Sequence, residues 1–197
     1  QHSADLLELG ELWARIHAYT MMAYFRQAQG EFEASAELFR KARAIEDTIV
    51  VRRSPTTDIT SLTQLAILLS RARPEMVHLL TDASQRIEQL GVHANDEVDF
   101  CSPAGYPREF IYSNLSCLLI AKGRAAEALP LLTRLLEAAT VMERHGDEMR
   151  YLVMMALAQH SLGNTRVALD SLSRALILAE PEGYVRLFVD EGQPMAE

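Results

Sequence analysis

Short turns at regular places along the chain constrain its fold more than any other feature. They fall at Gly30, Arg73-Pro74, Gly123 and Gly163. Each turn lies between two segments in which apolar residues recur every three or four positions, as expected for amphipathic helices. Two helices joined by so short a turn lie antiparallel and pack along their lengths. The sequence therefore predicts four helical hairpins.

The predicted hairpins span about 3–47, 59–90, 110–143 and 147–179, and a capping segment follows over 181–197. Between the second and third hairpins, residues 91–109 are rich in Asn, Asp, Pro and Gly, so we expect a loop there with at most one short turn. The 197 residues include only nine glycines and seven prolines, and the rest favours helix-forming types. We therefore expect an all-α protein with a single domain over residues 1–197.

The turn spacings indicate internal repeats. The turns are 43, 50 and 40 residues apart (73−30, 123−73 and 163−123), longer than the roughly 34 residues of a strict tetratricopeptide repeat. The position that must be small for two helices to approach closely is nevertheless occupied by Ser35, Ala128 and Ala168. The Arg73 unit fits worst, with His78 at that position. The pattern predicts a tetratricopeptide-like α-solenoid, a right-handed superhelix of antiparallel hairpins that bury their apolar faces against their neighbours.

The second half of the chain also resembles a known family. The resemblance is carried by the segments 120–124, 127–129, 131–132, 156–158, 163–164, 168–169 and, above all, 175–192. These residues resemble the helical-repeat sensor region of MalT-like, LuxR-type ATP-dependent transcriptional regulators, and the first half of the chain resembles it more loosely. The resemblance implies an inducer-binding or partner-binding scaffold. In such regulators an ATPase module precedes this region and a helix-turn-helix DNA-binding domain follows it.

The resemblance also sets expectations for cofactors and partners. No G-x-x-x-x-G-K-[ST] phosphate loop occurs in the sequence, so we expect no cofactor in this domain and ATP only in an upstream module. Pro194 suits the first turn of a new helix, so the chain looks cut from a longer regulator. The expected partners are a small-molecule inducer or protein effector, other domains of the same regulator and a possible second copy of the chain.

Charge and cysteine content exclude several other classes. The formal net charge of −8 argues against direct contact with nucleic acid, which requires Lys and Arg to neutralise phosphates. Cys101 and Cys117 form no CxxC motif and no signal peptide precedes them, which indicates a reducing, cytoplasmic setting. No apolar run approaches the length of a membrane span, so we expect no membrane contact.

Catalytic and metal-binding patterns are weak. His93, Asp96, Glu97, Asp99 and Cys101 lie together in the predicted loop, but their spacing matches no recognised metal site. A solvated polar loop is the better interpretation. No Ser or Cys lies in a motif resembling a nucleophile elbow. We therefore expect no enzymatic activity.

Binding residues are predicted on one face of the solenoid. By analogy with tetratricopeptide repeats, the first helix of each hairpin lines the concave face. The inward positions are His17, Thr20, Tyr24, Gln27, Thr60, Thr63, Ser70, Arg71, Phe110, Ser113, Cys117, Arg150 and His160. This mixture of aromatic rings with hydroxyl, amide and guanidinium groups suits a small polar ligand such as a sugar, or a peptide. For Tyr24 and Phe110, packing within the hairpins is the alternative to ligand stacking.

Two functions remain open. The first is an effector-sensing and protein-interaction or oligomerisation domain of a MalT-like, LuxR-type regulator. The second is a free-standing helical-repeat adaptor that recruits a protein or peptide. A phosphate-loop ATPase and a helix-turn-helix in the same gene would support the first, and a stop codon after Glu197 the second. In either case Tyr184, Leu187 and Phe188, spaced i, i+3, i+4, are expected to cover the end of the last hairpin.

Overall fold

A computed structural model describes residues 2–46, 48, 62–63, 66–67, 70, 74–102, 105–189 and 191 of the 197-residue chain. Within these ranges the chain forms helices, turns and loops without a β-strand, which confirms the predicted all-α class. The chain divides into two compact units, Gln1–Ala83 and Ser84–Glu197. The expectation of one domain over residues 1–197 stays a prediction.

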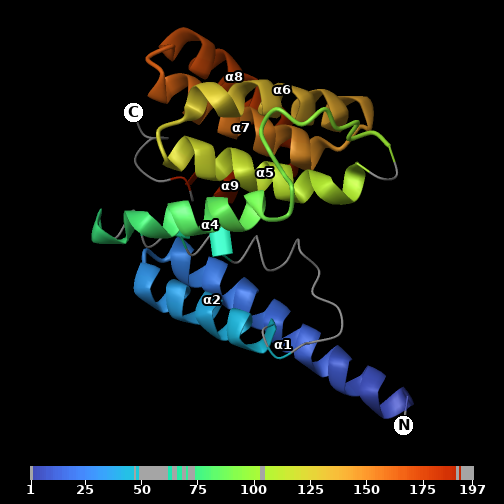
Figure 1. Ribbon diagram of the computed structural model, residues 1–197. Coiled ribbons are helices and arrows are strands. Elements are labelled where there is room, and N and C mark those ends of the chain that lie inside the picture. Colours follow the sequence, from blue (N-terminus) through green and yellow to red (C-terminus); the bar gives the residue numbers. More distant parts are fainter. Residues whose placement is uncertain are drawn as a thin grey trace. The chain divides into compact units, whose positions relative to one another are not determined.

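The first unit contains an antiparallel hairpin of two long helices (Figure 1). Helix α1 spans His2–Ala28 and helix α2 spans Phe32–Glu46. The buried apolar residues between them are Ile16, Ala23, Phe39 and Ala42. Ser35, at the position predicted to be small, is completely buried, so the two backbones approach closely there.

The rest of the first unit is described in part. The 3₁₀ turn η1, Pro74–Val77, leads into helix α4, His78–Glu88, and the boundary between the two units falls within α4. The helix predicted over 59–72 lies mostly outside the described residues. The described positions within that range are helical, and they are Leu62, Thr63, Ala66, Ile67 and Ser70.

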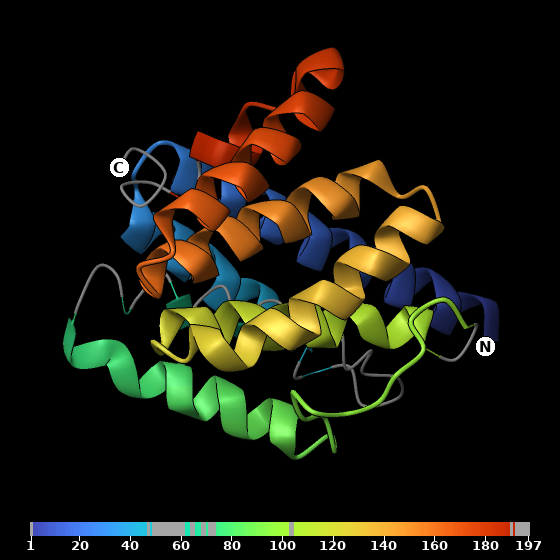
Figure 2. The ribbon, with the colours of Figure 1, turned by 90° about the horizontal axis from the view of Figure 1, so that it is seen from above.

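The second unit is a stack of helical hairpins (Figure 2). Its elements are α5, Tyr106–Ala121; α6, Ala125–Val141; α7, His145–Ser161; α8, Thr165–Ala179; the 3₁₀ turn η2, Glu180–Glu182; and α9, Arg186–Val189. Helix α5 packs against α6, α6 against α7, and α7 against α8. The most deeply buried apolar side chains of these helices include Leu118, Leu131, Leu132, Leu135, Met149 and Leu152.

Helix α5 begins at Tyr106, before the expected start at Phe110. The prolines and Gly105 were expected to keep residues 91–109 irregular. Pro107, however, lies in the first turn of α5, where the missing backbone N–H has no helical acceptor to lose. The irregular segment therefore ends earlier than the composition predicts.

Helices α5, α6 and α7, and the turn η2 that continues α8, each end on one residue in the left-handed conformation. The φ angles are 72° at Gly123, 54° at Glu143, 79° at Gly163 and 68° at Gly183. These residues recur every 20 positions (143−123, 163−143 and 183−163). In each turn the next residue donates its N–H to a carbonyl five positions back, as in the 2.8 Å bond from Arg144 to Ala139. This is the Schellman motif, and Glu143 occupies a place that favours glycine.

Glu143→Gly should therefore stabilise the protein. A left-handed residue with a Cβ costs roughly 1–2 kcal/mol, and the greater freedom of glycine in the unfolded chain offsets part of that gain. We expect the free energy of unfolding, measured with urea, to rise by about 0.5–1 kcal/mol. Glu143→Ala removes the same side chain but keeps the strain, so it should give no such gain. Equal stabilisation by both variants would show that the side chain, not the backbone, is responsible.

The loop before α5 is folded onto the helices of its own unit. Tyr112 of α5 is fully buried, packs edge-on against Phe100 at 5.3 Å between ring centroids, and donates a 2.7 Å hydrogen bond to the Asp96 carboxylate. Arg134 of α6 donates to the carbonyl oxygens of Ala94, at 2.9 Å, and Asp96. The loop is therefore held from both helices of the hairpin that follows it.

A close backbone approach closes this loop. A Cβ atom at Gly105 would lie 1.9 Å from the carbonyl oxygen of Asp99, so only glycine fits. The Gly105 N–H also donates a 3.0 Å hydrogen bond to the Ser102 hydroxyl oxygen, which holds the two ends of the turn together. The sequence signal for a loop at this position thus reflects a real steric requirement.

Tyr112 should make stability depend on alkaline pH. Burial and the Asp96 carboxylate raise the pKa of the Tyr112 phenol from 10.0 to about 12. A raised pKa contributes stability that is complete below pH 10 and is lost as the pH rises through about 12. Tyr112→Phe keeps the ring and lacks the hydroxyl. The difference in unfolding free energy between wild type and Tyr112→Phe should therefore be largest at pH 8 and smaller at pH 11, and an unchanged difference would contradict this assignment.

Candidate functional site

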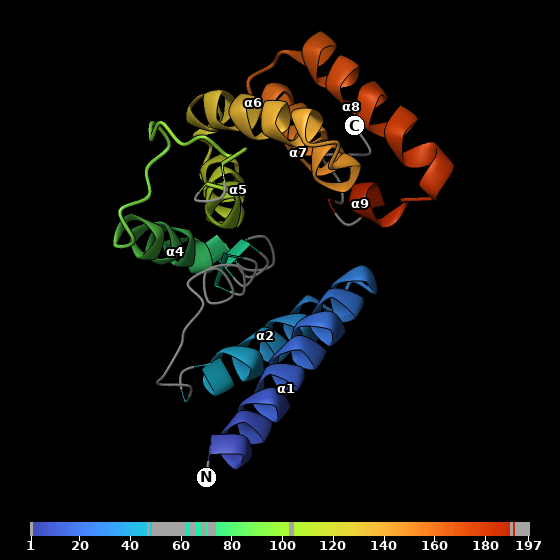
Figure 3. The ribbon, with the colours of Figure 1, turned by 90° about the vertical axis from the view of Figure 1, so that its right-hand side faces the viewer.

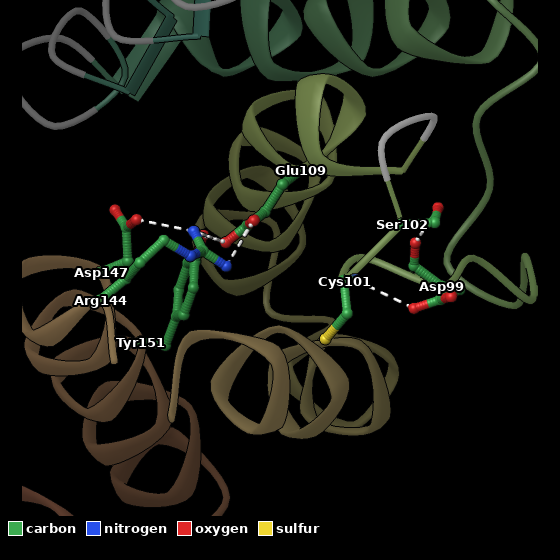
Figure 4. A network of polar contacts seen from close by, with 7 residues as sticks. All are labelled: Asp99, Cys101, Ser102, Glu109, Arg144, Asp147 and Tyr151. Atoms are coloured by element: carbon green, nitrogen blue, oxygen red, sulfur yellow. Dashed lines mark hydrogen bonds and ion pairs between the residues drawn. The ribbon is translucent and has the colours of Figure 1, made fainter. Parts of the chain in front are cut away.

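A buried charge network joins α5 to α7 (Figure 4). Glu109, in the first turn of α5, is 3% exposed. Its carboxylate forms an ion pair with Arg144 at 2.8 Å and accepts a 2.6 Å hydrogen bond from the Tyr151 hydroxyl. Arg144 also pairs with Asp147 at 2.8 Å. A single guanidinium group therefore pairs with two carboxylates, one from each helix.

The network stays charged despite its burial. For Arg144, burial alone would lower the pKa, but the hydrogen bond and charge of Glu109, followed by Asp147, outweigh it and raise the pKa. For Tyr151, burial and then the Glu109 carboxylate raise the pKa far above its usual value, so the phenol remains a hydrogen-bond donor. The arrangement fixes the first turns of α5 and α7 against each other.

Beside this network, the structure brings two predicted binding residues together. Phe110 follows Glu109 in α5, and Arg150 precedes Tyr151 in α7. The Arg150 guanidinium carbon lies 5.9 Å from the centre of the Phe110 ring, within cation–π range. Phe110 is 50% exposed and Arg150 is exposed, so the pair is accessible. We call Phe110 and Arg150 the α5–α7 pair.

The other predicted residues of the second unit are less accessible than this pair. Cys117 of α5 is half-buried, and its Sγ lies 4.0 Å from the sulfur of Met154 in α7. Ser113 is buried at 7% exposure, and His160 is half-buried near the end of α7. A role in binding remains a prediction for these residues and for the α5–α7 pair.

In the first unit the predicted residues lie along α1 and in the helical positions after α2. His17 is exposed, and Thr20, Tyr24 and Gln27 are half-buried. The Tyr24 ring packs edge-on against Phe39 at 5.5 Å, the hairpin packing that was the alternative to ligand stacking. Thr63 is buried and Ser70 is half-buried, with its hydroxyl donating to the Ile67 carbonyl at 2.9 Å. Thr60 and Arg71 lie outside the described residues.

The polar loop residues bond to one another. The Cys101 N–H donates to the Asp99 carboxylate at 3.0 Å, and the Ser102 hydroxyl donates to the Asp99 carbonyl at 2.7 Å (Figure 4). In the part of the chain that the structure describes, no three His, Cys, Asp or Glu residues are grouped to hold a metal ion. Within those same ranges no helix is long and apolar enough to cross a membrane.

The end of the last hairpin is covered by α9, which contacts α7 (Figure 3). Phe188 is buried and Leu187 is half-buried, as the spacing predicts. The prediction for Tyr184 is wrong, because Tyr184 is 49% exposed. Helix α9 begins only at Arg186, so Tyr184 lies before it and does not share its apolar face.

Comparisons with known proteins agree with this architecture. The family described as the MalT-like TPR region matches residues 1–197. The chain belongs to the MalT-like TPR region family. No curated protein matches the sequence of the chain. The family match confirms the resemblance that the second half of the sequence carries most strongly.

Solved structures similar to this MalT-like TPR region are helical-repeat proteins. A candidate kinesin light chain of Podosopora anserina with nearly identical TPR-like repeats aligns over 91% of this chain and 88% of its own, at 16% identity and a TM-score of 0.51. A variant of those repeats aligns over 86% and 96%, at 16% identity and a TM-score of 0.39. At this identity the first alignment shows the fold alone, and it confirms the predicted TPR-like α-solenoid class.

Sequence reasoning missed Glu109, Arg144 and Tyr151. Glu109 was assigned to the loop, and Arg144 falls in the connection between the predicted hairpins 110–143 and 147–179. Glu109 and Arg144 are 35 residues apart in sequence, so only the antiparallel packing of α5, α6 and α7 reveals that they meet. One signal was available in the sequence. Arg124 and Arg144 each directly follow a left-handed turn residue, and each has an acidic residue three positions later with which it forms an ion pair.

Those two arginines provide a matched test. Arg144→Ala leaves the buried Glu109 carboxylate without its ion pair, which should lower the free energy of unfolding by about 3 kcal/mol. Arg124→Ala removes an equivalent pair with Glu127, but both of those side chains are about half exposed, so stability should hardly change. Chemical denaturation of both variants checks this. Equal losses would mean that the burial of the network contributes nothing.

Proposed function

We propose that this chain is the effector-sensing and protein-interaction domain of a LuxR-type transcriptional regulator, and that it also supports self-association. The observation that carries this proposal is the match of the MalT-like TPR region to the whole chain. A helical-repeat module of this fold presents extended helix surfaces, which suit recognition of another molecule. The domain needs no cofactor of its own in this proposal, and ATP would bind to an upstream module of the regulator.

The α5–α7 pair is the part of the surface we assign to effector contact. The exposed Phe110 ring offers a flat apolar surface, and the Arg150 guanidinium carries several hydrogen-bond donors in one plane. Together they suit a compact polar ligand, such as a sugar ring with its hydroxyl groups, or a side chain of a protein effector. The buried network beneath them holds the two helices at a fixed separation, which preorganises the pair.

In this proposal the effector acts by differential affinity. A ligand bridging α5 and α7 binds more tightly to the arrangement of hairpins that brings Phe110 and Arg150 together. It therefore shifts the regulator toward that arrangement, by no more than the difference between its affinities for the two states. The bound arrangement favours association with other domains or with a second copy.

Calorimetric titration of the chain tests the proposal. The ligands are a panel of mono- and oligosaccharides and the ATPase module of the same regulator. Phe110→Ala and Arg150→Ala should each weaken binding by about tenfold or more, because each removes half of the contact surface. Arg174→Ala, at an exposed position of α8, is the matched control and should bind like wild type. If no ligand in either class binds to wild type, the sensing role is refuted.

A further inference from the structure

Helix α1 is apolar on two opposite sides. Its inner side packs on α2 through Ile16 and Ala23. On its outer side Ala14, Ala18, Met21 and Phe25 are all exposed. A surface helix normally carries polar residues opposite its buried face, and a helix that is apolar all round is buried against something on both sides.

The outer residues form a continuous stripe. They follow one another at steps of four, three and four, so all four lie on one face of α1. Met21 is 55% exposed, Phe25 is 58% exposed, and the neighbouring Met22 is 51% exposed. We call Ala14, Ala18, Met21 and Phe25 the outer stripe. Exposure of this many large apolar side chains in one place marks an interaction surface.

The order of sizes along the outer stripe makes it complementary to itself. The two small residues come first and the two large residues come last. When two such helices pack antiparallel about a two-fold axis, Ala14 of one faces Phe25 of the other, and Ala18 faces Met21. Every layer then pairs a small side chain with a large one, which fills the interface without overpacking. A parallel pair would place like beside like.

Charges at the edge of the stripe also fit the antiparallel arrangement. Glu11 lies near the start of the stripe and Arg26 near its end, on the same flank of α1. In the antiparallel pair each Glu11 lies level with position 28 of the other copy, two residues or about 3 Å along the axis from that copy's Arg26. That guanidinium already pairs with Glu31 at 2.8 Å and is 42% exposed, so a second carboxylate can approach it. Two symmetric contacts of opposite charge result, whereas a parallel pair would bring like charges together.

We propose that the outer stripe of α1 is a homodimer interface, in which it packs antiparallel against the same stripe of a second copy. The inference rests on the self-associating role proposed above and adds to it the surface, the direction and the pairing of residues. A two-fold axis between Ala18 and Met21 makes the contact isologous and closed, so association stops at the dimer.

Complementation between two variants of the 197-residue chain tests this geometry. Two layers of the homodimer pair residue 18 of one copy with residue 21 of the other. Met21→Glu places a negative charge opposite Ala18 in both of these layers, and Ala18→Lys places a positive charge opposite Met21 in both. Sedimentation analysis should show each variant dissociating at least tenfold more readily than wild type. Mixing them should restore a 1:1 dimer, because one layer then pairs Lys with Glu and the other is unchanged. Leu169→Glu, at an exposed apolar position of α8, should leave the wild-type dimer intact.

Three results would overturn the inference. A wild-type chain that stays monomeric up to about 100 μM would contradict the homodimer interface. If Leu169→Glu dissociates the dimer and Met21→Glu does not, the dimer interface lies on α8 and not on the outer stripe. Failure of the mixture to form a dimer would exclude the antiparallel pairing. None of these results bears on ligand binding at the α5–α7 pair. The sensing role is tested separately, by the calorimetric titration described above. Circular dichroism should show that Met21→Glu and Ala18→Lys leave the helices folded.

Discussion

The left-handed residues that end α5, α6, α7 and the turn η2 after α8 are the constraint on which the second unit depends. Gly123, Glu143, Gly163 and Gly183 stop successive helices at a constant spacing. Because the spacing is constant, each hairpin repeats the geometry of the previous one, and residues 40 positions apart, such as Phe110 and Arg150 (150−110), occupy equivalent places on neighbouring helices. The Schellman bonds satisfy the last carbonyl groups of each helix, so the turns remain short. Because the turns are short, α7 lies close enough to α5 for Arg144 and Tyr151 to reach Glu109.

The buried network then fixes the relation between those helices. Apolar contacts are tolerant of small shifts, whereas an ion pair with a shared hydrogen-bond partner permits few geometries. Removing two charged groups from water is costly, and their attraction roughly offsets that cost. We therefore infer that Glu109, Arg144 and Tyr151 specify the register of α7 against α5 more than they add net stability. The exposed Phe110 and Arg150 are held by their buried chain neighbours.

The sequence predicted those features of the fold that depend on residues close together in the chain. Glycine turns, helical spacing and small residues such as Ala128 and Ala168 identified the hairpins, since each follows from backbone or packing requirements near in sequence. It did not predict the start of α5, because Pro107 is equally compatible with a loop and with a first helical turn.

Long-range and context-dependent features were also missed. The exposure of Tyr184 depends on where α9 begins, which periodicity alone does not determine. The contact of Glu109 with Arg144 depends on how three helices pack. Among the predicted binding residues, the meeting of Phe110 and Arg150 follows from the repeat, while the burial of Ser113 depends on its neighbours in the fold.

The equal spacing of the turns has a consequence for how the chain can vary in length. One residue inserted into α6 would rotate everything after it by about 100° about the helix axis, because an α-helix has 3.6 residues per turn. Such an insertion would turn Arg144 away from Glu109 and Arg150 away from Phe110 while leaving the composition almost unchanged. The length of α6 between Gly123 and Glu143 is therefore more constrained than the identity of its exposed residues.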